Sequence, residues 1–180
     1  MSQATLERLL AQARALHQAL PRDPQRAALH HHARRALIDW AGVCVGALRE
    51  PEANTLRRLL NAGAGPVACF GGEHASAAEA AWLHGTLSHL LDFDDTHVGS
   101  ILHTSGPVWA ALWAVGQAHA IDEAALLDAY VVAFQFGARL GGNGLGERLT
   151  RSGWHVTPVL GRLAGALAVS LARRLSLPQT

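Results

Sequence analysis

The chain has 180 residues, of which 49% are apolar and 16% are charged, and its formal net charge is +1. This length and apolar content allow a buried core without disulfides or metals, so we expect one ordered domain over residues 1–180. The near-neutral charge and the lack of a basic stripe argue against a nucleic-acid partner.

The residue types narrow the chemistry and the compartment. All fifteen cationic side chains are arginine, so no Schiff base can form on a lysine, and proton transfer falls to His, Asp, Glu, Cys or Tyr130. Cys44 and Cys69 lie in apolar contexts and are expected to be buried free thiols. No apolar run reaches the roughly 18–20 residues of a membrane span, and the N-terminus lacks a secretory signal. We therefore expect a soluble, cytoplasmic protein with no membrane partner.

Apolar residues recur at three- and four-residue steps along most of the chain, which predicts helix after helix. The starts are marked by Asp23-Pro24, by Pro51, by a Ser76/Glu79 capping box and by Asp122. The predicted helices span residues 6–16, 24–48, 51–60, 77–90, 105–118, 123–140 and 158–175. The fold class is therefore all-α, a multi-helix bundle.

The segments between these helices are short or rich in glycine. "NAGAG" (61–65) ends the third helix, and "PVACF" (66–70) is the one plausible strand. Residues 141–157 are expected to be irregular. Gly161 and Gly165 lie four residues apart on the last helix, a spacing that lets two helix backbones pack closely.

A polar joint separates two of the apolar helices. "LDFDDTH" (91–97) and "ILHTS" (101–105) place carboxylates, a threonine and histidines together on one loop. Such a joint is either a solvated turn that caps helix ends, a divalent-metal site, or an acid–base pair, since crowded carboxylates and imidazoles shift one another's pKa. The spacing matches no tight metal motif.

Further histidines surround this joint in the sequence. In "SGWHVT" (152–157), His155 either bonds to backbone beside a packed tryptophan or is carried against the joint by a mobile loop. The run at 30–32 is expected to form a solvated helix face. His84 and His89 lie near a helix C-terminus, where the dipole favours a protonated imidazole.

The chain resembles the MmgE/PrpD family, which includes 2-methylcitrate dehydratase, cis-aconitate decarboxylase and iminodisuccinate epimerase. The resemblance covers residues 5 to 178 of this chain and is to the N-terminal helical part of the family's proteins. It depends on the blocks "RRALIDWAGVCVGAL", "HGTLSHLLDFDDTH", "HTSGPVWAALWA", "LLDAYVVAFQFGARLG" and "SGWHVTPVLGRLAGALAVSLARRLSLP" in that order. It implies proton transfer beside a carboxylate of a small di- or tricarboxylate substrate, with no metal and no organic cofactor.

The resemblance also assigns roles to residues of the joint. It implies that His103 and His155 transfer protons or bind a substrate carboxylate, and that Asp92 orients them or accepts a proton. Thr96, Asp95 and Ser105 are the candidate substrate-binding residues. We expect Asp92, His103 and His155 to gather around a hollow that fits a small anion.

Three features depart from the family pattern. Thr104 stands where the family has the proline of its "HPS" block, and His84 replaces an asparagine. The chain is also less than half the length of its relatives, so the α/β domain with their lysine and tyrosine site residues is expected to be missing. Among nearby cations, Arg151 alone is a candidate to neutralise a polycarboxylate.

Several functions remain open on this basis. The favoured one is a lyase or isomerase component, with dehydration ahead of decarboxylation or epimerisation, that needs a second half or partner chain. The alternative is a non-catalytic helical module for dimerisation or small-anion binding, and a metal-binding protein is a third. We expect a homodimer or a complex, with residues 109–115 and 161–171 as contacts.

Overall fold

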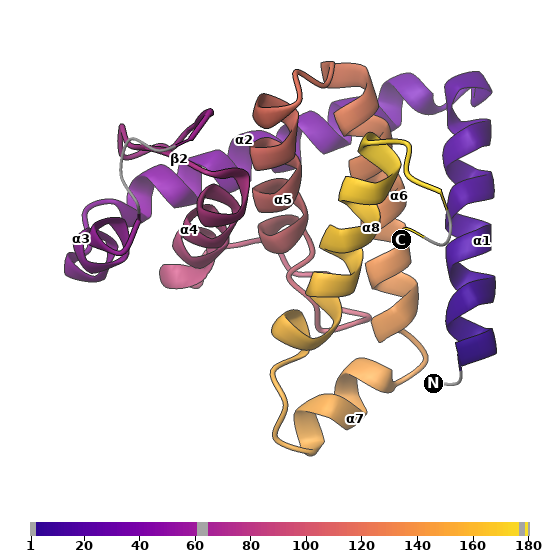
Figure 1. Cartoon of the computed structure of the whole chain (residues 1–180). Coiled ribbons are helices and arrows are strands. Elements are labelled where there is room, and N and C mark those ends of the chain that lie inside the picture. Colours follow the sequence, from indigo (N-terminus) through magenta and orange to yellow (C-terminus); the bar gives the residue numbers. More distant parts are fainter. Residues whose placement is uncertain (1–2, 61–64, 177–178, 180) are drawn as a thin grey trace.

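The computed structural model describes residues 3–60, 65–176 and 179 of the chain, and it confirms a mostly helical fold (Figure 1). The α-helices of these residues are α1 (Gln3–Ala19), α2 (Arg26–Ala47), α3 (Pro51–Arg58), α4 (Ala77–Leu90), α5 (Ser105–Ala118), α6 (Glu123–Gly141), α7 (Leu145–Arg151) and α8 (Arg162–Ala172). Within the described ranges, no helix is both long enough and apolar enough to cross a membrane.

The helices form a row with one long helix lying across it. In Figure 1 the row runs α4, α5, α8, α6, α1, and each helix contacts the next. Helix α2 crosses the row and contacts α4, α5 and α6, while α3 packs beside α4. The core between these layers includes Trp40 of α2 and Trp109 of α5, both at most 2% exposed.

Local sequence signals account for the helix starts. At α4 the Ser76 side chain accepts a hydrogen bond from the Glu79 backbone N–H, and the Glu79 carboxylate accepts one from Ser76, which confirms the capping box. Asp122 accepts a bond from the Ala125 N–H and caps α6. Asp23 caps a turn instead, by accepting a bond from the Gln25 N–H, so α2 begins at Arg26, two residues after the predicted start.

The region around the predicted strand is a small hairpin. Strands β1 (Val67–Ala68) and β2 (His74–Ala75) pair antiparallel. Behind them His84 is fully buried, accepts a hydrogen bond from the Phe70 N–H, and packs against the Trp40 ring. Burial lowers the pKa of His84 to about 4, so this imidazole is neutral at pH 7.

The structure differs from the predicted elements in three places. The predicted irregular stretch 141–157 contains helix α7, and the predicted last helix is a π-helical turn, Thr157–Gly161, followed by α8, which ends at Ala172. Of the histidine run, only residues 31 and 32 are exposed. His30 is buried against Asp128, so the prediction of a fully solvated face is wrong. The predicted stop at 61–64 lies outside the described residues.

Close helix packing and free thiols are confirmed. A Cβ at Gly161 would approach Pro107 Cγ to 2.7 Å, so glycine is required where α8 meets α5. Cys44 and Cys69 are free and buried. The segments 109–115 and 161–171, predicted to contact a partner, are largely buried against one another within this chain.

Candidate active site

The loop between α4 and α5 is tightly constrained. Asp92 adopts a left-handed conformation (φ 54°) that turns the chain back over the end of α4, and its N–H bonds to the His89 carbonyl. Further along the loop, Ser100 packs against α6 and α7 at Gly141 and Gly146. A Cβ at Gly146 would lie 2.1 Å from the Ser100 carbonyl oxygen, so only glycine allows this approach. The loop is therefore held firmly enough to position side chains.

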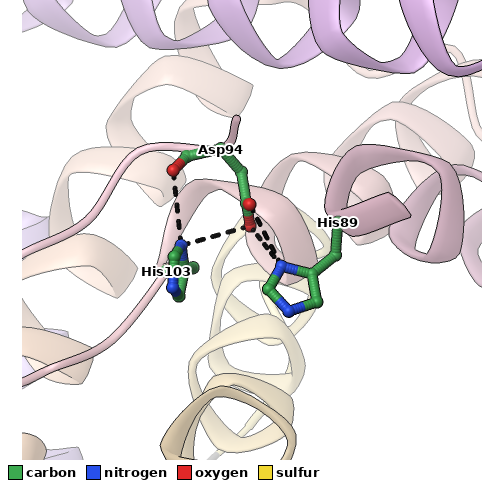
Figure 2. A group of neighbouring side chains, drawn as sticks. All are labelled: His89, Asp94 and His103. Atoms are coloured by element: carbon green, nitrogen blue, oxygen red, sulfur yellow. Dashed lines mark hydrogen bonds and ion pairs between the residues drawn. The ribbon is translucent and has the colours of Figure 1, made fainter. Parts of the chain in front are cut away.

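A buried carboxylate at the centre of this loop contacts two imidazoles (Figure 2). Both Asp94 carboxylate oxygens lie 3.0 Å from His89 Nδ1, and Oδ2 lies 3.4 Å from His103 Nδ1. The Asp94 side chain is 4% exposed, against 38% for His89 and 17% for His103. The last turn of α4 and the residues preceding α5 thus meet at one acidic group.

A third imidazole reaches this cluster from the far end of the chain. The His155 ring stacks on the His89 ring at 5.1 Å between centroids and lies 6.3 Å from the His103 ring. The His103 backbone N–H donates to Thr157 Oγ1 at 3.1 Å, which ties the two segments together. The structure confirms that the imidazole of residue 155 lies against the joint. The packed-tryptophan alternative is wrong, since Trp154 is 62% exposed.

Asp95 and Ser105 form a separate hydrogen-bonded group. The Ser105 hydroxyl lies 2.5 Å from Asp95 Oδ2 and 2.6 Å from the Tyr130 hydroxyl, and the Ser105 N–H also donates to Asp95. Burial raises the pKa of Asp95, although the bonds from Ser105 partly offset this, and burial keeps the Tyr130 hydroxyl protonated by raising its pKa. Ser105 therefore bonds to both Asp95 and Tyr130. His89 and His103 contact Asp94 instead.

The other two predicted site residues have different surroundings. Thr96 lies at the cluster, with its hydroxyl 3.3 Å from His103 Nδ1. Asp92 is exposed, and its side chain makes no hydrogen bond or ion pair with the described residues. The carboxylate that the structure places against the imidazoles is Asp94, two positions further on.

Sequence reasoning missed the pairing of His89 with Asp94. His89 was explained by the helix dipole, and Asp94 was one of three equivalent carboxylates. The signal that would have found the pair is local. A histidine in the last turn of a helix meets a residue five positions later when the chain reverses through one left-handed residue, here Asp92.

The cluster is open to solvent on one side, and large apolar side chains on the loops that carry it are exposed. His155 is exposed, and Phe93, Val98 and Trp154 are 74%, 84% and 62% exposed. Arg151, the predicted neutralising cation, pairs with Glu147 at 2.6 Å on α7. Within the described part of the chain, the ion-pair partners of Asp94 are the two imidazoles.

Such an arrangement supports two kinds of chemistry. Imidazoles held by a carboxylate can take and return a proton near neutral pH. The same atoms could hold a metal ion, because one ligand atom each from His89, Asp94 and His103 lie within 4.8 Å of one another. The fold is thus a helical bundle that carries imidazoles around one buried carboxylate.

The chain belongs to the MmgE/PrpD family. Residues 13–180 match the MmgE/PrpD N-terminal domain. Over 104 residues the chain is 33% identical to the cis-aconitate decarboxylase-like protein oryM of Aspergillus oryzae. That match covers 54% of this chain and 22% of the relative, so the chain corresponds to a minor part of the relative's length.

Proposed function

We propose that this chain is the helical component of an MmgE/PrpD-type lyase or isomerase that acts on a small di- or tricarboxylate. The observation that carries the proposal is the grouping of three imidazoles from separate segments. His89 and His103 lie against Asp94, and the His155 ring stacks on the His89 ring. Family membership and the relative with a decarboxylase-like name support the same class of chemistry.

The proposed step is proton transfer beside a substrate carboxylate. His103 is held by Asp94 and Thr96, which fix its ring orientation, while exposed His155 faces the solvent side of the cluster. One imidazole would take the proton next to the carboxylate, and the other would return a proton to the product or leaving group. Dehydration is the favoured outcome, with decarboxylation and epimerisation as variants of the same proton transfer.

The proposal includes a covering portion from outside these 180 residues. A polycarboxylate needs permanent cations in a site that excludes water, and Arg151 is exposed and engaged with Glu147. The exposed apolar side chains Phe93, Val98 and Trp154, on the loops that carry the cluster, fit a surface covered by more protein. That portion would come from a second half, a partner chain or a second copy in a homodimer.

The test is turnover of citrate-, methylcitrate- and aconitate-like acids by the chain together with any co-purifying partner. His103→Ala and His155→Ala should each lower turnover by about 10²–10⁴-fold, and exposed His119→Ala is the matched control that should leave turnover unchanged. A folded, complete assembly that turns over none of these acids would overturn the proposal. Calorimetric binding that His103→Ala abolishes, without turnover, would instead support the anion-binding module.

A further inference from the structure

We propose that His89, Asp94 and His103 form a binding site for a divalent transition-metal ion such as Zn²⁺ or Co²⁺. The proposed function needs no metal, so this proposal does not rest on it, although the two share His103. From the sequence, the candidate metal ligands were the Asp and His residues of the joint, and their spacing fits no tight metal motif. The structure adds His89 from α4 and selects one of the carboxylates (Figure 2).

Two of the three ligand-atom spacings already match those around a bound ion, and all three atoms lie within 4.8 Å of one another. Zinc ligands lie about 2.0–2.1 Å from the ion, so neighbouring ligand atoms are about 3.0–3.4 Å apart in octahedral or tetrahedral geometry. His89 Nδ1 is 3.0 Å from the Asp94 oxygens, and His103 Nδ1 is 3.4 Å from Oδ2. Two imidazoles and one carboxylate are a ligand set suited to zinc, cobalt or iron.

The charge at the cluster also favours a cation. The Asp94 side chain is 4% exposed, and its ion-pair partners among the described residues are imidazoles that can be neutral. In these contacts His89 Nδ1 faces the Asp94 carboxylate, and His103 Nδ1 faces that carboxylate and also the Asp94 backbone carbonyl at 3.3 Å, so both nitrogens donate N–H bonds. A divalent ion would displace these two protons, and the trio of neutral imidazoles and carboxylate that binds it carries one net negative charge. A divalent ion neutralises this buried carboxylate better than two neutral rings do.

Part of the coordination sphere would remain accessible. The His89 side chain is 38% exposed, and exposed His155 stacks on its ring. Water, a small anion or His155 can therefore complete the sphere from the open side. A bound ion occupies His103 and Asp94, so it would inhibit proton transfer at these groups.

The experiment is a Co²⁺ titration of metal-free, untagged full-length chain, followed by visible absorption and by competition with Zn²⁺. We expect one ion per chain and a d–d spectrum of a protein-bound site. His89→Gln, Asp94→Asn and His103→Gln should each weaken binding by at least about tenfold. The matched control is the double variant His31→Gln/His32→Gln, which removes two exposed histidines elsewhere and should bind as wild type does.

Two results would overturn the site. One is wild-type protein, folded by circular dichroism, that shows no Co²⁺ or Zn²⁺ binding below millimolar concentration. The other is binding that the His31/His32 control loses and the three ligand variants keep. Because the readout is the metal spectrum, absence of turnover leaves this test unaffected, and absence of metal binding leaves the proposed function untouched.

Discussion

Two carboxylates in this molecule, those of Asp128 and Asp94, are similarly buried but have different partners. Asp128 of α6 accepts two hydrogen bonds from Arg26 at 3.0 and 2.8 Å and lies 2.7 Å from His30 Nε2. Asp94 lies between His89 and His103 at 3.0 and 3.4 Å. The Asp128 side chain is 8% exposed and that of Asp94 is 4% exposed, so burial does not distinguish them.

The difference lies in the permanence of the compensating charge. Arginine stays protonated at all relevant pH values. Burial alone would raise the pKa of Asp128, but the hydrogen bonds from Arg26 and His30 outweigh it and hold the pKa below its usual value. Around Asp94 the ion-pair partners are two imidazoles, which carry no permanent charge. We infer that Asp128 holds α2 to α6, whereas Asp94 is set up to exchange a proton or bind an ion.

The largest expected effect is on the free energy of unfolding, which should respond differently to substitution of Asp128 and of Asp94. Asp128→Asn should lower the free energy of unfolding by about 3–5 kcal/mol, because it leaves Arg26 and buried His30 without their acid. Asp94→Asn should cost less than about 1 kcal/mol, because neutral imidazoles can bond to the amide. Urea unfolding at pH 7.5 with EDTA measures both.

The matched control for this comparison joins the same two helices at the surface. Arg34 of α2 pairs with Glu123 of α6 at 2.7 Å, and both side chains are well exposed. Glu123→Gln should leave the unfolding midpoint unchanged within error. Equal losses for the two aspartate variants would break the proposed distinction between them.

His84 extends the comparison, because it is a buried histidine with no carboxylate hydrogen-bonded to it among the described residues. The folded pKa of His84 is about 4, below its usual 6.5, so the unfolded chain binds the extra proton as the pH falls. Above pH 6.5 His84 is neutral in both the folded and the unfolded chain, so it does not affect the free energy of unfolding. That free energy falls progressively between pH 6.5 and 4. The expected loss from pH 7.5 to 5 is about 2 kcal/mol.

Urea unfolding across this pH range tests the role of His84. His84→Gln should flatten the curve over this window, whereas His31→Gln, at an exposed position, should leave it unchanged. A wild-type curve that is flat from pH 7.5 to 5 would contradict the neutral burial of His84.

The smallest expected effect concerns how the Asp94 cluster is held. Apart from His89 at the end of α4, its residues come from loops, while those around Asp128 come from helices. The loops therefore need an anchor such as the bond from the His103 N–H to Thr157. Thr157→Val keeps the shape but removes the acceptor, and it should cost about 1 kcal/mol. It should also weaken Co²⁺ binding several-fold, whereas Thr157→Ser should retain both properties. Unchanged metal affinity in the valine variant would show that the anchor is dispensable.

Much of the fold could be predicted because local signals mark its helices. The capping box at Ser76 and the cap at Asp122 set the starts of α4 and α6, and both are local in sequence. Helix α7 was missed because its flanking glycines suggested a loop. Yet Gly144 (φ 77°) only turns the chain, after which Leu145 and Leu149 pack against the core.

The site was predicted less completely, for a geometric reason. Residue types marked the joint, and the resemblance marked His103 and His155, whose rings do lie together. Which of three nearby aspartates turns inward depends on one backbone angle, the left-handed φ at Asp92, and composition does not encode it. The burial of His30 likewise depends on a contact with Asp128 from α6, 98 residues away.

The π-helical turn Thr157–Gly161 begins two residues after His155 and precedes α8. A π turn holds one residue more than α-helical spacing allows. Deleting Val159 would restore that spacing and rotate the preceding segment by about 100° about the axis of α8. The imidazole of His155 would then swing off the bundle end while α8 kept its phase against α5. Deleting one residue would therefore move His155 away from the other imidazoles while α8 keeps its packing.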